Sequence, residues 1–93
     1  MYKIRTTSGE VLYTSETASD MRSALEEAVI AGTDLHRANL VCADLTCARL
    51  VRASLADARL ACARLVRANL TDAGLTGANL AGADLTDARG VRW

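Results

Sequence analysis

The sequence contains very few aromatic residues. Phenylalanine is absent and aromatics make up only 3% of the 93 residues, although apolar residues amount to 51%. Alanine and leucine supply most of that apolar total, so any core must be narrow and regular. The length suits one small domain, which buries a smaller share of its surface than a large domain does.

Neither sign of charge dominates, and no hydrophobic stretch is long. Eleven Lys and Arg balance eleven Asp and Glu, which argues against a strongly cationic nucleic-acid binder and a highly acidic mimic of DNA. No apolar run approaches the ~20 residues that span a bilayer, and no signal-peptide pattern opens the chain. Three cysteines, an odd number, fit a reducing compartment. We therefore expect a cytoplasmic protein with no membrane or direct nucleic-acid partner.

Motifs for catalysis are missing as well. The chain has no G-x-S-x-G, no P-loop and no dinucleotide-binding fingerprint. Cys42, Cys47 and Cys62 do not have the spacing of a zinc finger. His36 is the only histidine, and we interpret it as a surface residue rather than a catalytic base. The sequence thus predicts no enzyme, no cofactor and no bound metal.

The chain does contain an uninterrupted five-residue repeat. A leucine stands at every fifth position, and an alanine precedes each by two residues except in the first unit, which has Thr33. The residue between them is polar or small. The leucines are Leu35, Leu40, Leu45, Leu50, Leu55, Leu60, Leu65, Leu70, Leu75, Leu80 and Leu85. A period of five fits neither an α-helix nor a flat strand, so another path must bring these leucines to one core.

A square coil provides such a path. If each unit forms one side and then turns a corner, four units close a turn and every leucine points to the axis. Successive turns of four units then stack at roughly 4.8 Å through backbone hydrogen bonds between parallel segments. The repeat is long enough for just under three such turns.

Charges that did not define the period are compatible with this stacking. Outward residues separated by four repeat units form columns in which like charges are never adjacent. The columns include Asp44 with Arg64 and Asp84, Arg52 with Asp72 and Arg92, Arg37 with Asp57, Arg67 with Asp87, and Arg49 with Asn69 and Arg89. We interpret them as determinants of register, with a partner-binding surface as the alternative.

The units "ANLVCADLTCARL" and "ANLTDAGLTGANLAGADL" resemble the A-(D/N)-L-x-x units of the pentapeptide-repeat family. The resemblance covers residues 33–89. It implies a fold of the β class, a right-handed quadrilateral β-helix (a pentapeptide-repeat solenoid), here of about three coils.

Some members of that family bind DNA gyrase, imitate duplex DNA and protect against quinolones. The resemblance therefore implies an alternative function as a DNA-mimicking gyrase-binding protein. The surface of this chain departs from that role, because residues 33–93 contain eight Arg against six Asp, a net charge of +2. Those members are also several turns longer and dimerise through a C-terminal element.

The segment that precedes the repeat, residues 1–32, follows another pattern. Residues 2–6 and 10–14 predict a β-hairpin around Ser8-Gly9, and residues 18–31 predict a helix that begins at Thr17 or Ser19 and stops at Gly32. The helix would place Met21, Leu25, Ala28 and Val29 on one face and pair Arg22 with Glu26. We expect segment 1–32 to cap the β-helix of residues 33–93 within one compact unit, and a docking helix is the alternative.

The cysteines fall on the predicted corners. Cys42 and Cys62 are separated by four repeat units and hence stacked, with Cys47 one side further round. We interpret all three as inert small residues, with an incidental disulfide and redox sensing as alternatives.

The other end of the coil has no comparable cap. Gly90 occupies the place of the next leucine, so the last turn is expected to expose an apolar floor. The residues at this end are Leu75, Leu80, Leu85, Val91 and Trp93. Either Trp93 folds beneath the floor, or two molecules meet in a tail-to-tail homodimer, which we favour because one indole covers too little.

Together these features predict a non-enzymatic interaction or scaffold module. Its partner would be a protein that the sequence does not identify.

Overall fold

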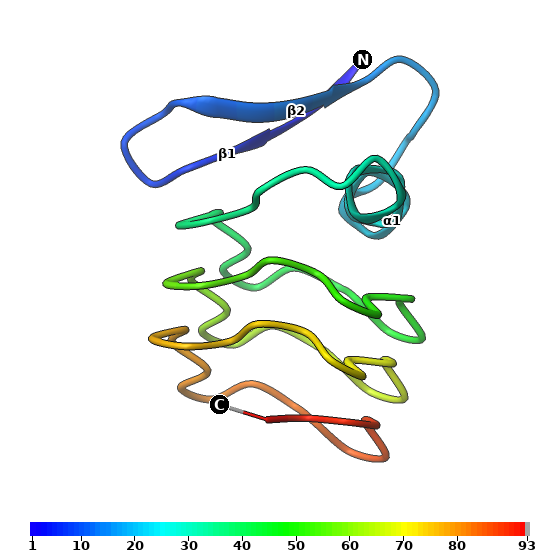
Figure 1. The fold of residues 1–93 in the computed structure, drawn as a ribbon, viewed down its shortest axis with the longest axis vertical. Coiled ribbons are helices and arrows are strands. Elements are labelled where there is room, and N and C mark those ends of the chain that lie inside the picture. Colours follow the sequence, from blue (N-terminus) through cyan, green and yellow to red (C-terminus); the bar gives the residue numbers. More distant parts are fainter. Residues whose placement is uncertain (93) are drawn as a thin grey trace.

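The structure, a computed structural model, describes residues 1–92. A hairpin of two strands, β1 (Tyr2–Arg5) and β2 (Val11–Ser15), precedes one helix, α1 (Met21–Ile30). The repeat follows as turns stacked beneath the hairpin and α1 (Figure 1). Within residues 1–92, no helix is long and apolar enough to cross a membrane.

The predicted hairpin is present with slightly different bounds. Strands β1 and β2 pair antiparallel, with Tyr2 opposite Ser15 and Ile4 opposite Tyr13, and a bulge follows Ile4. Because strand residues alternate between two faces, Ile4 enters the core while its neighbours face outward. Gly9 adopts a φ of +94° in the connecting turn, a conformation that glycine tolerates best.

Helix α1 begins later than the sequence predicts. Asp20, with extended φ and ψ of −145° and 169°, is the N-cap, and its Oδ1 accepts from the Ser23 N–H at 2.8 Å. The predicted caps Thr17 and Ser19 were therefore wrong. This backbone bond is the main reason why the pKa of Asp20 lies below its ordinary value.

The predicted stop at Gly32 is correct. Gly32 has a φ of +73°, and the Thr33 N–H donates to the Ala28 carbonyl at 3.0 Å. This pattern is a Schellman motif, in which a left-handed glycine follows the C-cap, here Ala31.

The buried face of α1 differs in part from the prediction. Leu25 and Ala28 are fully buried together with Ala24, which the prediction omitted, while Met21 and Val29 are only partly buried. The predicted Arg22–Glu26 ion pair is wrong, since no Lys or Arg side chain within residues 1–92 lies within 4.0 Å of a carboxylate oxygen. Both side chains reach the coil instead, as described below.

The repeat forms a β-helix whose turns are joined by isolated parallel bridges. These bridges join Asp34 to Ser54 and Ser54 to Gly74, and the other polar positions pair in the same way. A regular set of hydrogen bonds holds the turns together: the Leu35 N–H donates to the Ser54 carbonyl at 2.9 Å, and the Arg59 N–H donates back to the Ala38 carbonyl at 2.9 Å. Because bridge partners are always four repeat units apart in the sequence, one turn takes four units.

A β-turn follows each leucine of the repeat. The Leu35 carbonyl accepts from the Ala38 N–H at 3.0 Å, and the same bond recurs down the chain. The residue before the alanine has positive φ, as at Arg37, Cys42 and Asp57 with values near +60°. Positive φ at the third residue of a turn is the signature of a type II turn, which glycine fits best.

The leucines fill one continuous core. Leu35 through Leu75 are at most 1% exposed, and Ile4, Ala24, Leu25 and Ala28 join the same cluster from the N-terminal segment. Hairpin, helix and coil therefore share one hydrophobic core.

The far end of the coil differs from the expected floor. Leu80 and Leu85 are only partly buried, but Leu75 is 1% exposed, so its assignment to an exposed end was wrong. Val91 packs against the core, which covers part of this end. Gly90 leaves the regular path with a φ of +69°, and a Cβ on it would lie 2.6 Å from the Thr71 Cα. Trp93, the expected cap, lies outside the described residues.

Candidate functional site

The parallel bridges divide the outer surface into four stacks of repeat units. The first stack comprises residues 33–37, 53–57 and 73–77; the second 38–42, 58–62 and 78–82; the third 43–47, 63–67 and 83–87; the fourth 48–52, 68–72 and 88–92. Side chains from each stack keep their order from one turn to the next. The outer surface therefore presents its side chains in columns.

The N-terminal segment occupies the place of a preceding turn. In the lower turns, the Arg59 and Asn69 N–H groups donate to the Ala38 and Ala48 carbonyls, both at 2.9 Å. The corresponding N–H of Asn39 donates to the Arg5 carbonyl at 2.7 Å, at the end of β1. Thr6 adds an antiparallel bridge to Ala38. The hairpin thus pairs with the upper edge of the coil, which would otherwise be an open strand edge.

Helix α1 satisfies a second position on this edge. The Glu26 Oε2 accepts from the Arg49 backbone N–H at 2.8 Å, and Arg22 donates to the Thr46 carbonyl at 3.4 Å. These two residues were predicted to pair with each other. They extend to the coil because α1 lies across its edge, which supports the predicted capping role of segment 1–32.

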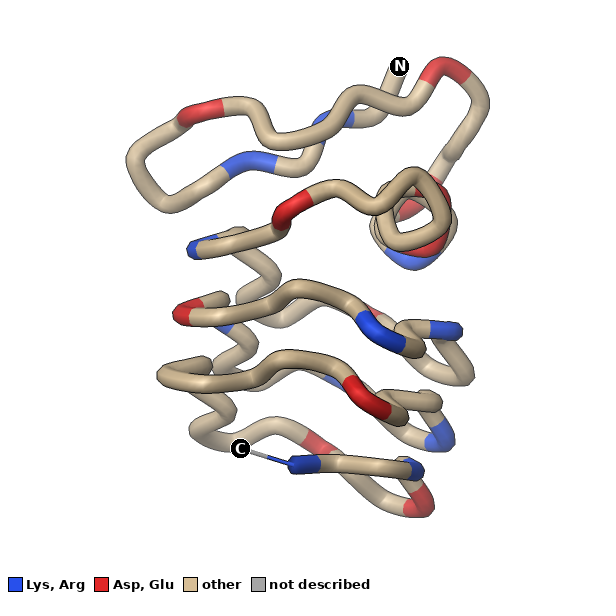
Figure 2. Tube along the Cα trace, viewed as in Figure 1, with Lys and Arg blue, Asp and Glu red and all other residues tan. Residues whose placement is uncertain are grey.

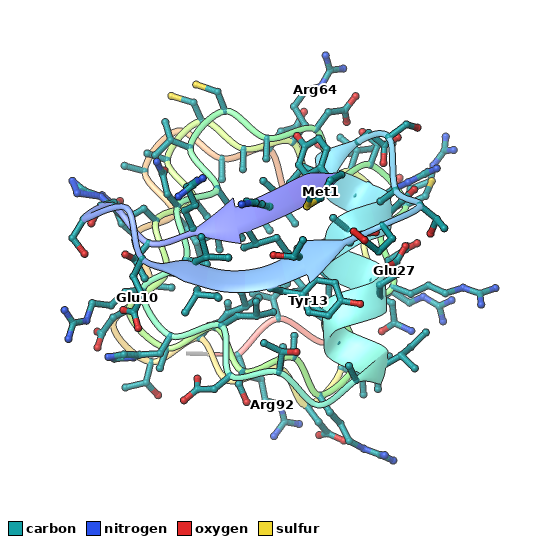
Figure 3. All side chains as sticks on the ribbon, turned by 90° about the horizontal axis from the view of Figure 1, so that it is seen from above. Met1, Glu10, Tyr13, Glu27, Arg64 and Arg92 are labelled. Atoms are coloured by element: carbon teal, nitrogen blue, oxygen red, sulfur yellow. The ribbon has the colours of Figure 1, made fainter. Side chains whose placement is uncertain are left out.

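A cluster of hydroxyls holds the hairpin to α1. Tyr13 and Ser15 of β2 donate to Glu27 Oε1 at 3.2 and 2.7 Å, and Thr17 donates to Oε2 at 3.2 Å. Figure 3 shows Tyr13 extending toward Glu27 on α1. Burial, followed by the hydrogen bond and charge of Glu27, raises the pKa of Tyr13. Sequence analysis missed this cluster; the alternation of Tyr13 and Ser15 on one face of β2 was its only signal.

The charge columns are in the predicted register, but their side chains do not form direct ion pairs. Asp44 and Arg64 are bridge partners, as are Arg64 and Asp84. Each aspartate bonds locally: Asp44 Oδ1 accepts from the Thr46 Oγ1 at 2.6 Å and from its N–H at 3.2 Å, and Asp84 does the same with Thr86. Basic and acidic segments alternate down the turns in Figure 2.

These local bonds dominate the electrostatics of both aspartates. The pKa values of Asp44 and Asp84 lie below the ordinary range, mainly because the threonine hydroxyl and N–H stabilise the carboxylates. The positive charge of Arg64 lowers both pKa values by a smaller amount. The column therefore contributes a longer-range attraction rather than a direct contact.

The cysteines lie on exposed corners, as free thiols. Cys42 and Cys62 are in consecutive turns of the second stack, and the Cys42 N–H donates to the Ala61 carbonyl at 2.9 Å. The Cys62 sulfur lies over Gly82, where a Cβ would be 3.3 Å away. Cys47 belongs to the third stack, above Arg67. Within residues 1–92, no three cysteine, histidine or carboxylate side chains form a group that could hold a metal.

His36 lies on the surface of the first stack. Its Nε2 accepts from the Arg37 Nε at 3.2 Å, and its Nδ1 is 3.7 Å from an Asp57 carboxylate oxygen. The side chain is 42% exposed. The contacts of His36 within the described chain include no serine or cysteine nucleophile, so the geometry is that of a polar surface contact.

A groove opens where the C-terminal end of α1 meets the fourth stack. It has a volume of about 340 Å³ and is lined by Glu26, Val29, Ile30, Arg49 and Val51. Ile30 is 87% exposed, although it is one of the largest apolar side chains of the helix. A smaller, polar hollow of about 290 Å³ lies at the other end of α1, between Asp20, Arg22, Asp44 and Thr46.

The comparisons with known proteins agree with the repeat geometry. The sequence model of the family described as pentapeptide repeats matches residues 21–55 and 48–87, with eight copies of the repeat. The first ten matched residues form α1 in the structure, so the coil itself begins after them. No curated protein and no solved structure matches the chain.

Proposed function

Because the chain belongs to the family of pentapeptide-repeat proteins, we propose that it is a non-enzymatic module that binds a protein partner through its outer surface. The observation that carries this proposal is the exposed apolar groove between α1 and the fourth stack. Because Ile30 is exposed, it contributes little to the stability of the fold. Its position beside columns of arginine is instead typical of a recognition surface.

The absence of a reactive arrangement in residues 1–92 is consistent with this role. Every buried polar side-chain atom described there has a hydrogen-bond partner, so no buried polar atom is left unpaired as a candidate for binding a ligand. The three thiols are exposed, and the partly exposed His36 has no described contact with a thiol.

For the fold, we propose a right-handed, four-sided coil of about three turns. The spacing of the bridges and the recurring turn after each leucine support four sides. The hand follows from membership of the family. We also propose the cytoplasm as the compartment, because exposed free thiols are maintained there.

The gyrase-binding alternative has weaker support. A mimic of DNA needs a continuous acidic surface, whereas the coil carries more Arg than Asp. A supercoiling assay with purified gyrase separates the two functions: we expect no inhibition at micromolar protein, and inhibition would favour the alternative.

An affinity experiment tests the proposed function. The purified protein is immobilised and incubated with lysate of its native host, and retained proteins are then titrated individually against it by calorimetry. We expect at least one saturable complex. If no purified candidate binds, the module has no protein partner under these conditions and the proposal is overturned.

A further inference from the structure

The fourth stack differs from the other three in charge. It contains Arg49, Arg52, Arg89 and Arg92 against Asp72 alone, whereas the first, second and third stacks have net charges between −1 and +1. All four arginines are exposed. Within residues 1–92, the one contact between a basic side chain and a carboxylate is that of His36 with Asp57 in the first stack, so none of the four arginines has a described carboxylate within 4.0 Å.

The apolar groove lies at the upper end of this same stack. Its walls include Val29 and Ile30 of α1 and Val51 of the coil, and Arg49 stands at its edge. The backbone N–H of Arg49 is engaged by Glu26, which fixes the position from which the guanidinium extends. Aliphatic walls beside a row of cations favour an acidic segment that also carries an aliphatic side chain.

The spacing of the arginines suits an extended peptide. Arg49 and Arg89 are separated by two turns, with Asn69 between them, which corresponds to roughly 10 Å at ~4.8 Å per turn. An extended chain in the polyproline II conformation advances ~3.1 Å per residue with three residues per turn. Carboxylates at every third position therefore share one face at a spacing of roughly 9 Å and reach both arginines. The columnar order of the coil thus predicts a periodic acidic ligand.

We propose that the groove and the arginines of the fourth stack together bind an extended acidic segment of the protein partner. This inference rests on the proposed function and names the surface and the ligand. An aliphatic side chain of the segment occupies the groove between Ile30 and Val51, and carboxylates bind Arg49 and Arg89. Phosphate would also meet these arginines, but a nucleic acid has no aliphatic side chain for the groove between Ile30 and Val51.

The test uses a fluorescein-labelled dodecapeptide with one terminal isoleucine, a glutamate at every third position and serine elsewhere. Anisotropy titrations compare it with the same peptide carrying glutamine in place of glutamate. We expect saturable binding of the acidic peptide and at least tenfold weaker binding of the glutamine peptide. Arg49→Glu and Arg89→Glu should each weaken binding roughly tenfold, because repulsion replaces attraction.

The chain offers a matched control at Arg59. Arg59 occupies the same position within its repeat unit as Arg49 and Arg89, but it lies in the second stack. Its neighbours in the turns above and below are Asn39 and Asn79, so it is not part of a row of arginines. Arg59→Glu should leave the dissociation constant within twofold. Ile30→Ser tests the groove and should also weaken binding several-fold, while the exposure of Ile30 predicts an unchanged thermal midpoint.

Several results would overturn the inference. The first is equal affinity for the glutamate and glutamine peptides. The second is an equal loss of peptide affinity in the Arg59→Glu and Arg49→Glu variants. The third is tighter binding of a single-stranded DNA dodecamer than of the acidic peptide. A partner recovered from lysate that binds the Arg49→Glu/Arg89→Glu protein as tightly as the parent would refute the surface and leave the proposed function intact.

Discussion

The carboxylate of Glu26 accepts the backbone N–H of Arg49 at 2.8 Å, in the position that the Ala48 carbonyl takes for Asn69 one turn below. A side chain of α1 therefore stands in for the backbone of a missing turn. The first turn of a solenoid has donors that no preceding turn can accept, and an uncapped edge invites pairing with other chains. Glu26 and the Arg5 carbonyl together accept two N–H groups of the first turn and so cap the N-terminal end of the coil.

Removing the Glu26 carboxylate should weaken the cap. We expect Glu26→Ala to lower the free energy of unfolding by about 1–2 kcal/mol, because a charge-assisted hydrogen bond to the Arg49 N–H is lost. Urea denaturation followed by circular dichroism measures the change. Glu16→Ala, at an exposed position outside the cap contacts, is the control. Equal effects of the two substitutions would show that the hydrogen bond adds nothing.

The middle of the leucine column should be the most sensitive part of the core. Leu60 and Leu65 are fully buried, so Leu60→Ala or Leu65→Ala should each cost about 2–5 kcal/mol and unfold so small a protein at moderate temperature. Leu85→Ala, at a partly buried position, should cost clearly less. Thermal unfolding of the three variants checks the order. A shift of only a degree or two for Leu60→Ala would contradict its inward position.

The bond between Asp44 and Thr46 should make stability depend on acid pH. The folded pKa of Asp44 is depressed below its ordinary 3.8, so its contribution is present above that value and is lost as the pH falls through the folded pKa. Thr46→Val removes the hydroxyl donor and should raise the carboxyl pKa, which NMR titration measures. Thr76→Val, which follows Gly74 rather than an aspartate, should leave the pKa of Asp44 unchanged. An unaltered titration in Thr46→Val would rule out the hydroxyl as the main cause.

The thiols should stay reduced. Stacked Cα atoms at ~4.8 Å fall within the disulfide range, but parallel side-chain directions disfavour the bond. We expect thiol titration to find three free cysteines in reducing buffer and at most a slow Cys42–Cys62 bridge in air. A bridge from Cys47 within one molecule would be incompatible with a turn of four repeat units.

The 93-residue chain should form a tail-to-tail homodimer, which we propose from the partial exposure of Leu80 and Leu85. Sedimentation should give a dimer at high micromolar concentration, and Leu85→Lys should shift it to monomer. Protein lacking residues 90–93 tests whether the C-terminal residues take part in the dimer contact. If this shortened protein still dimerises, the exposed leucines Leu80 and Leu85 are sufficient for the contact. A 93-residue chain that stays monomeric would favour an end covered within one chain.

The sequence by itself determined the coil. A leucine at every fifth residue is incompatible with a helix or a flat strand, and turning all eleven toward one core requires a path that turns once per unit. Charges separated by four repeat units then predicted the stacking of Asp44 on Arg64, because every turn repeats the same local geometry. Hairpin and helix were likewise readable from alternation and from Gly32.

Only the tertiary structure decided the contacts between the repeat and the segment that precedes it. Arg22 and Glu26 have the spacing of a helical pair, yet both bind the coil because α1 lies across its open edge. The same placement sets Ile30 beside Val51 and creates the groove. A periodic pattern specifies interactions between equivalent units, whereas this junction occurs once, and its geometry depends on how two unlike surfaces dock.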